Sequence, residues 1–308
     1  MNKSGMIPAR KSQLKFYRDI ALYSKGDDNK FVLYKPAGVT MKEMRVEEDR
    51  VPGDLYIKAE EKIKGLQEAQ KGFNLELASN IRSGEPAEVK ETLVTLIEET
   101  LAEPRSGSLE GVSGTIDVMM SDYAQETDII KQLLSVSSTD YSTTLHSINV
   151  MAFALAFALY VNMPRSKTKV LGISALLHDV GKTKINQEVL QAPRKLTDEE
   201  FIEIKRHTTV GYDTLRYCKF ADKNISLAAL EHHEKLDGSG YPNGNNRISE
   251  IAQIIGIIDC YEALTNNDRP YRSAMVPRET LELLVGDVKA GKFNKDIFQQ
   301  FAYSLVGK

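Results

Sequence analysis

The stretch LGISALLHDVGK, residues 171–182, places a histidine and an aspartate at the end of an apolar helical segment. Leu176 and Leu177 can face a core there, whereas His178 and Asp179 face a neighbouring helix. Adjacent helical residues project about 100° apart, so the imidazole can reach one metal ion while the carboxylate lies between two. Taken alone, such a dipeptide is more often a hydrogen-bonded helix end. The other histidines of the chain change that interpretation.

All five histidines lie beyond residue 145. Two of them, His232 and His233, are adjacent in LEHHEKLDGSGYP, residues 230–242. Adjacent histidines rarely pack into an ordinary core, because each neutral ring needs partners for one donor and one acceptor nitrogen. A metal ion meets that need directly. His146 and His207 each lie on a separate helical segment. Either one alone reads more naturally as a core histidine, but together with the others they indicate a ligand set.

Asp259 interrupts IAQIIGIIDCYEAL, residues 251–264, an almost wholly apolar helix. A buried carboxylate is strongly destabilising unless it is paired or binds a metal. The predicted centre then has seven ligands, and all of them are nitrogen or oxygen donors rather than thiolates: His146, His178, Asp179, His207, His232, His233 and Asp259. This set disfavours a structural zinc site and is too large for one ion.

Two bridged first-row ions, about 3.5 to 4 Å apart, would suit hydrolysis, since such a pair lowers the pKa of a shared water and clamps phosphoryl oxygens. The mixed imidazole and carboxylate set predicts two metal ions, with iron as the first choice and manganese as the second. Ligand softness leaves zinc and nickel open.

Composition bounds the class of protein. With 308 residues, 42% of them apolar and 27% charged, the chain can fold into about two globular domains. A net charge of −3 offers no basic footprint for duplex nucleic acid and no polybasic membrane anchor. The start lacks an apolar signal core and there are two cysteines, which predicts a cytoplasmic protein. The most apolar run, residues 151–161, is shorter than the ~20 residues that cross a bilayer, so we expect a buried helix.

The two parts of the chain differ in their patterns. Strand-like runs at residues 31–35 and 53–60, followed by a helical pattern from Pro86, predict a small α+β domain over residues 1–114 with a linker from 104. Residues 115–308 predict an all-helical domain, in which Thr197 and Glu200 form a capping box. The expected helices cover residues 116–136, 140–161, 167–180, 197–207, 220–235, 249–265, 277–290 and 294–306.

These motifs, in this order, resemble the HD-GYP family, a branch of the HD-domain metal-dependent phosphohydrolases. The resemblance covers residues from about 140 to 290 and is carried by His146, HDVGK at 178–182, the segment 207–211, HHEKLDGSGYP at 232–242, and RPYR at 269–272 after the Asp259 helix. It implies an all-α HD-type domain with a di-iron or related centre that acts on the bacterial second messenger cyclic di-GMP.

The resemblance also assigns roles residue by residue. The seven candidate ligands match the family's metal ligands, with Asp179 as the bridge. Lys182 matches the lysine beside the scissile phosphate, so Asp179 and Lys182 are the expected catalytic residues. A solvated helix-end lysine is the alternative for Lys182. Arg269, Tyr271 and Arg272 match the substrate-contacting segment, although Arg272 is equally well explained as a solvated loop charge.

The signature loop and three departures complete the comparison. Gly238, Gly240, Tyr241 and Pro242 match the loop, which in the family is structural and contacts partners. Ser142 stands where some members carry a glutamate for a third metal, which argues against a trinuclear site. At the family's second acidic position in the Asp259 helix stands Glu262, which keeps the charge but is longer. The segment TNNDRPYR, residues 265–272, is one residue longer than the usual pattern, which would displace Arg269 and Tyr271.

The resemblance implies metal-dependent hydrolysis of cyclic di-GMP to pGpG and onward to GMP. The alternative is a degenerate receptor that binds cyclic di-GMP, or a diguanylate-cyclase-type partner domain, without turnover. A general nucleotide phosphohydrolase is the third reading, and HHEKLDGSGYP argues against it. Residues 1–114 are expected to regulate or dock. The helix 86–103 and the apolar segment 129–134 could form a homodimer, but a packed core stripe explains them better.

Overall fold

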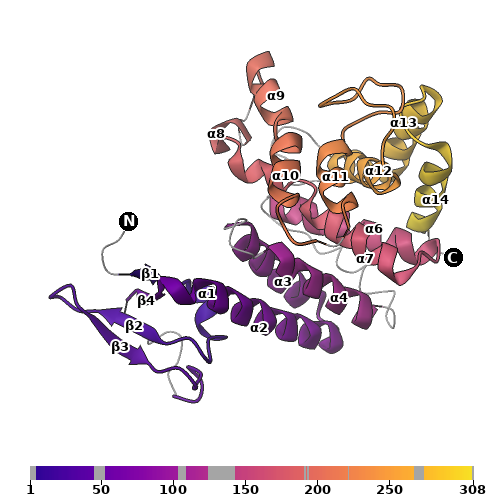
Figure 1. The fold of residues 1–308 in the computed structure, drawn as a ribbon. Helices are drawn as coiled ribbons and strands as arrows, with labels where there is room; N and C mark the ends of the chain where they lie inside the picture. Colours follow the sequence, from indigo (N-terminus) through magenta and orange to yellow (C-terminus); the bar gives the residue numbers. More distant parts are fainter. Residues whose placement is uncertain are drawn as a thin grey trace.

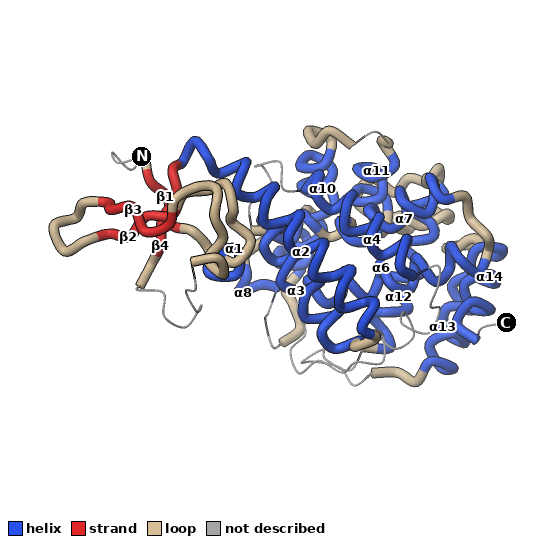
Figure 2. The backbone as a smooth tube through the Cα atoms, turned by 90° about the horizontal axis from the view of Figure 1, so that it is seen from below, coloured by secondary structure: helices blue, strands red, loops and turns tan. Residues whose placement is uncertain are grey.

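The computed structural model describes residues 5–44, 53–102, 109–123, 143–190, 192, 194–220, 222–266 and 274–306. A small antiparallel sheet lies at one end of the molecule, and helices make up the rest (Figures 1 and 2). The predicted fold class, a small α+β region followed by an all-α region, is confirmed.

The sheet contains four strands in the order β1-β4-β2-β3: β1 (Met6–Pro8), β2 (Leu22–Lys25), β3 (Phe31–Lys35) and β4 (Leu55–Lys58). Each neighbouring pair is antiparallel, with Tyr23 of β2 opposite Tyr56 of β4. Alternate residues of β4 are buried, which is the pattern of a sheet covered on one face. The predicted strand at 31–35 is β3, and the run at 53–60 contains β4.

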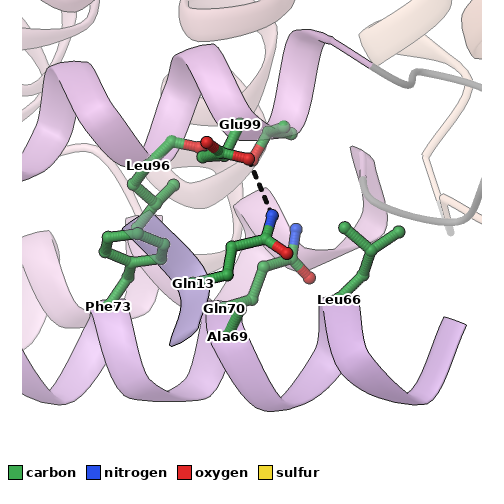
Figure 3. Close-up of a pocket in the computed structure, with 8 residues that line it drawn as sticks. Gln13, Leu66, Ala69, Gln70, Phe73, Leu96 and Glu99 are labelled. Carbon is green, nitrogen blue, oxygen red and sulfur yellow. Dashed lines mark hydrogen bonds between the residues drawn. The ribbon is translucent and has the colours of Figure 1, made fainter. Parts of the chain in front are cut away.

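A short helix, α1 (Lys11–Leu14), fastens the segment after β1 to the helices that follow. The carboxylate of Glu99 accepts hydrogen bonds from Arg10 Nη1 at 2.9 Å, Ser12 Oγ at 2.6 Å and Gln13 Nε2 at 2.7 Å. Figure 3 shows Gln13 facing Glu99 beside a small cavity that Phe73 also lines. At about 10 Å³ the cavity has room for about one water molecule, not for a nucleotide.

Three helices connect the sheet to the rest of the fold: α2 (Lys62–Ser83), α3 (Pro86–Leu101) and α4 (Val112–Tyr123). The sequence pattern does not predict α2, because the buried stripe of this helix is only one residue wide and begins with Gly65 and Ala69. Gly84, with a φ of 74°, ends α2, and Pro86 occupies the first turn of α3. α2 packs against both α3 and α4.

The second part of the chain is helical throughout its described residues, apart from the loops. Its helices are α6 (Thr143–Tyr160), α7 (Arg165–Leu177), a 3-10 turn (Val180–Lys184), α8 (Gln187–Leu190), α9 (Asp198–Lys205), α10 (His207–Leu215), α11 (Asn224–Glu231), α12 (Glu250–Thr265), α13 (Pro277–Lys289) and α14 (Lys295–Val306). They agree with the predicted helices, except that α8 and most of α10 were not predicted. Residues 124–136, 140–142 and 221 of the predicted helices lie outside the described residues.

The central helix is α6, which contacts α7, α12 and α14. Among the described residues it is the one helix long and apolar enough to cross a membrane, yet 67% of it is buried inside the fold. It is the buried helix that the apolar run at 151–161 predicts.

The apolar core continues from the sheet region into the helical region. α3 contacts α6 and α4 contacts α7, and at the second contact a Cβ on Gly172 would lie 3.0 Å from Ile116 Cγ2. α4, which begins at Val112, packs on both α2 and α7. A domain boundary at residue 114 stays a prediction.

Candidate metal centre

Seven polar residues converge in the middle of the helical region. They come from helix ends and from one helix interior: His146 in the first turn of α6, His178 and Asp179 at the end of α7, His207 at the start of α10, His232 and His233 at the end of α11, and Asp259 within α12. The helices that carry them pack against one another (Figure 1). All seven predicted ligands are thus brought together.

Asp179 lies at the middle of the cluster. Its Oδ2 atom is 3.6 Å from His146 Nε2 and 3.4 Å from His178 Nε2. Its Oδ1 atom is 3.3 Å from His207 Nε2 and 3.8 Å from His232 Nε2. Each carboxylate oxygen therefore faces a different pair of histidines, which is the arrangement of a ligand that bridges two cations.

The surrounding side chains form two groups that could each hold a metal ion. His146, His178 and Asp179 make one group, and the donor atoms of its members lie within 4.8 Å of one another. His207, His232 and His233 make the other, with the same spacing.

Asp259 lies beside both groups. Its Oδ1 atom is 3.0 Å from His146 Nε2, and its Oδ2 atom is 3.8 Å from His233 Nδ1. It therefore supplies a second carboxylate next to Asp179.

Backbone carbonyls orient three of the imidazoles. The carbonyl oxygens of Ala175, Ile204 and Ala228 lie 2.7, 2.6 and 3.0 Å from Nδ1 of His178, His207 and His232. A carbonyl can only accept, so each ring carries its proton on Nδ1 and directs the lone pair of Nε2 at Asp179. Metal-binding histidines usually donate the N–H of their second ring nitrogen in this way.

Glu262 orients the fourth ring. Its Oε2 atom lies 2.5 Å from His146 Nδ1, and its Oε1 atom accepts from Asn149 Nδ2 at 2.9 Å and from Asn266 Nδ2 at 2.7 Å. Glu262 is 2% exposed. The sequence showed Glu262 as a second acidic residue, but its contact with His146, 116 residues away, required the fold.

Two buried polar atoms of the centre indicate that cations fit there. His178 Nε2 and Asp179 Oδ1 are buried, and neither makes a hydrogen bond within the described part of the chain. Buried polar atoms without a partner are costly and rare. Cations next to Asp179 would satisfy both atoms, and imidazole nitrogens with carboxylate oxygens are a donor set for first-row metals.

Burial keeps one group of imidazoles neutral. Burial lowers the pKa of His207 and holds the pKa of His232 well below its usual value. Burial also lowers the pKa of His233 to about 3, although the nearby Asp259 acts in the opposite direction. Neutral imidazole is the form that binds metals, so this group needs to lose no proton at neutral pH.

The other group is charged. Burial disfavours the charged form of His146, but the carboxylates of Glu262 and Asp259 outweigh it and raise the pKa of His146 to about 9. Burial likewise disfavours the Asp179 carboxylate, but Lys182 and His178 hold its pKa well below the usual value. Without a cation the carboxylates are therefore partly neutralised by a protonated His146.

Lys182 stands at the open edge of the centre, where 20% of its side chain is exposed. Its Nζ donates to Asp179 Oδ2. The turn that carries it packs tightly on α10, since a Cβ on Gly181 would lie 1.9 Å from the carbonyl oxygen of His207. Only glycine allows this approach, which explains the glycine of HDVGK.

The signature loop folds back over His233. The ring of Tyr241 lies 4.6 Å from the His233 ring, with an angle of 32° between the planes. The loop stays close because Glu234, 3% exposed, accepts from the backbone N–H groups of Asn243 at 2.8 Å and Asn245 at 3.0 Å. A Cβ on Gly240 would lie 2.4 Å from Glu234 Cα.

The structure describes some of the remaining predicted loop and substrate-contact positions and leaves out others. Gly238 has a φ of 79°, a conformation that glycine adopts without strain. Pro242 follows Tyr241 in the same loop. Arg269, Tyr271 and Arg272, the predicted substrate contacts, and Ser142 lie outside the described residues.

A fold built around buried histidine and aspartate pairs at helix ends defines a class of protein. The family model described as HD domain matches residues 126–297, and this chain belongs to that family. Within it, the motifs HDVGK and HHEKLDGSGYP place the chain in the HD-GYP branch.

Similar proteins include two curated relatives. A cyclic di-GMP phosphodiesterase of Pseudomonas aeruginosa is 30% identical over 195 residues, which cover 63% of this chain and 46% of the relative. A 3′3′-cGAMP-specific phosphodiesterase of Vibrio cholerae is 33% identical over 165 residues, 53% of this chain and 38% of the relative. The chain matches less than half the length of either relative.

A solved structure shares the fold over almost the whole chain. It is an HDG"Y"P protein from Bdellovibrio bacteriovorus, with a TM-score of 0.61 and 21% sequence identity, and the match covers 98% of this chain and 100% of the other. The N-terminal sheet and helices therefore belong to an architecture that another protein also has.

Proposed function

We propose that this protein is a metal-dependent phosphodiesterase that hydrolyses cyclic di-GMP to pGpG and onward to GMP. The observation that carries the proposal is the position of Asp179, whose two oxygens face two separate groups of imidazoles. Two bound metal ions, iron or manganese, would supply a nucleophilic water at neutral pH and neutralise phosphoryl oxygens. The names of the curated relatives support the reaction class.

The chain's own residues would hold and orient the reacting groups. His146, His178, His207 and His232 direct Nε2 atoms at Asp179, and His233 and Asp259 complete the set. Burial of the centre strengthens each electrostatic contact made there, because little water competes.

Lys182 would act on the phosphate. An ammonium has three donors, and one of them is used by Asp179. The others can reach a phosphoryl oxygen at the exposed edge and stabilise the negative charge that develops there. In this proposal Arg269, Tyr271 and Arg272, which follow α12 in the sequence, contact the nucleotide phosphates.

The test separates the enzyme from its alternatives. Purified protein is depleted of metal, reloaded with Fe²⁺ or Mn²⁺, and incubated with cyclic di-GMP or 3′3′-cGAMP, and the products are separated by anion-exchange chromatography. We expect pGpG from cyclic di-GMP. Faster cleavage of 3′3′-cGAMP would reassign the substrate. Full metal occupancy with no turnover of either nucleotide would overturn the enzymatic proposal, and tight binding without hydrolysis would support the receptor alternative.

We further propose that residues 1–114 are a regulatory or docking region of a cytoplasmic signalling protein, with a diguanylate-cyclase-type domain or a second copy of the chain as partner. The support for this proposal is that this region contacts, through α3, a helix of the metal centre. Glu99 ties the segment after β1 to α3, and α3 contacts α6, the helix that carries His146. Deleting residues 1–44 while measuring turnover and sedimentation tests the proposal, which fails if both are unchanged.

A further inference from the structure

A row of rings leads outward from the metal centre to the surface. Tyr241 covers His233, as described above. On its outer side the ring of Phe201, in α9, lies 6.5 Å from the Tyr241 ring at an angle of 74°. Lys205 Nζ lies 4.6 Å from the centre of the Phe201 ring and 5.3 Å from that of Tyr241. The row therefore ends in an aromatic ring with a cation over it.

Phe201 contacts Tyr241 and Lys205 but is not part of the hydrophobic core. It is 46% exposed, and none of the eight residues of α9 is buried. α9 carries four acidic residues, and like the neighbouring Ile202 the Phe201 side chain gives up hydrophobic stabilisation by facing water. Its position close to the candidate metal centre indicates a role in ligand binding instead.

The helix that carries Phe201 is firmly held. Thr197 and Glu200 form the predicted capping box at its start, and Arg194 donates two hydrogen bonds to Glu200, at 2.6 and 2.7 Å. At its end, one residue separates Lys205 from His207, a candidate metal ligand. The backbone therefore sets the distance between Phe201 and the centre.

A flat ligand can stack only on a ring of this row that is exposed. His233 and Tyr241 are in direct contact, so a base cannot insert between them. Phe201 is the first ring of the row that is exposed, and Lys205 Nζ lies over it. Nucleotide-binding proteins use exposed aromatic rings to stack bases, and a neighbouring ammonium can donate to the O6 and N7 acceptors of guanine.

We propose that Phe201 and Lys205 form a stacking subsite for one guanine base of the cyclic dinucleotide, with its phosphate at the metal centre. The inference rests on the proposed function and adds a specificity-determining subsite to it. Phe201 supplies the stacking surface, and Lys205 favours a base that carries acceptors on its outer edge.

The absence of tryptophan from the chain gives a direct test. Phe201→Trp introduces the chain's single tryptophan at the subsite, and Tyr303→Trp, at a 63% exposed position on α14, is the control. In Figure 1, α14 lies well away from α9. The probe is the hydrolysis-resistant bis-phosphorothioate of cyclic di-GMP, added to the metal-loaded full chain. We expect saturable quenching of the Phe201→Trp fluorescence and none for Tyr303→Trp.

Kinetics supply the second arm. Phe201→Ala should raise KM for cyclic di-GMP about tenfold with kcat within twofold and unchanged metal content, and Phe201→Tyr should restore KM. Ile202→Ala, at the 61% exposed neighbouring position, controls for damage to α9 and should leave KM unchanged. The Lys205→Gln variant should discriminate less between the guanine and adenine cyclic dinucleotides.

The outcomes that overturn the inference are distinct from those for the reaction. Bound probe with unquenched Phe201→Trp fluorescence overturns the stacking subsite alone, as does loss of kcat or metal in Phe201→Ala with KM unchanged. Absence of probe binding to the unsubstituted, metal-loaded protein overturns the subsite together with the assigned substrate. The fluorescence titration needs no turnover, so a catalytically silent protein is still tested.

Discussion

Glu262 Oε2 lies 2.5 Å from His146 Nδ1, and both side chains are almost fully buried. The carboxylate fixes the direction of the imidazole and raises its basicity, as second-shell partners of metal ligands do. One hydrogen bond between α6 and α12 thus determines how the first group of candidate ligands is presented.

Replacing this carboxylate should weaken metal binding. Above pH 9, where the His146 proton no longer competes, we expect Glu262→Gln to lower the metal affinity roughly 10- to 100-fold, because the amide can still accept from His146 but carries no charge. Competition with a fluorescent chelator measures the affinity. Glu250→Gln, at an exposed position on the same helix, is the matched control. An unchanged metal affinity in Glu262→Gln would show that the contact between Glu262 and His146 does not affect metal binding.

Asp179→Asn should reduce the bound metal from two ions to one or none, because both carboxylate oxygens face candidate ligands. Turnover should fall below detection. Metal content is measured by mass spectrometry of the dialysed protein, with Asp213→Asn, an exposed change on α10, as the control. Full metal content in Asp179→Asn would refute the assignment of the centre.

Lys182→Gln should separate chemistry from metal binding. We expect metal content to stay within error while kcat falls about 10²- to 10³-fold, as when one group that stabilises transition-state charge is lost. The neighbouring exposed Lys184→Gln controls for the loss of a positive charge in the same turn. Equal effects of the two substitutions would mean that Lys182 acts only through the general electrostatic field.

Metal affinity should rise with pH. In the metal-free centre the pKa of His146 is about 9, raised by Glu262 and Asp259 against burial, so between pH 6 and 9 its Nε2 proton must leave before a metal binds. The proton competes more as the pH falls, which predicts an affinity loss of about tenfold per pH unit below 9. The same chelator titrations at several pH values measure it, and an affinity that does not vary between pH 7 and 9 contradicts it. Glu262→Gln removes the main raising charge and should flatten the curve.

Gly181→Ala should disturb the fold at the centre itself. The added Cβ would lie 1.9 Å from the His207 carbonyl oxygen, so the turn must move away from α10. We expect a destabilisation of about 2 kcal/mol or more, measured by thermal unfolding, together with weaker metal binding. Gly286→Ala, where a Cβ meets nothing within 4 Å, should leave the protein as stable or slightly more stable. Equal melting temperatures for the two variants would contradict the packing argument.

The sequence alone predicts the family and most of the helices of this protein. The ordered motifs placed the chain in its family, and the apolar periodicity located most of the helices. The histidines at 146, 178, 207, 232 and 233 were assigned to one centre because neutral imidazoles in apolar surroundings need partners for both nitrogens. Helix α2 escaped prediction because its buried stripe is narrow and contains small residues, which carry a weak periodic signal.

The sequence by itself determined which atoms could bind metal and that they belong together, since donor type and local helical pattern are properties of short segments. Only the tertiary structure decided how those atoms are shared. The division of the Asp179 oxygens between two groups, the contact of Glu262 with His146, and the row from His233 through Tyr241 to Phe201 join residues up to 116 positions apart. Such distances depend on how separate helices pack, and packing is set by the whole core, so no local pattern in the sequence encodes them.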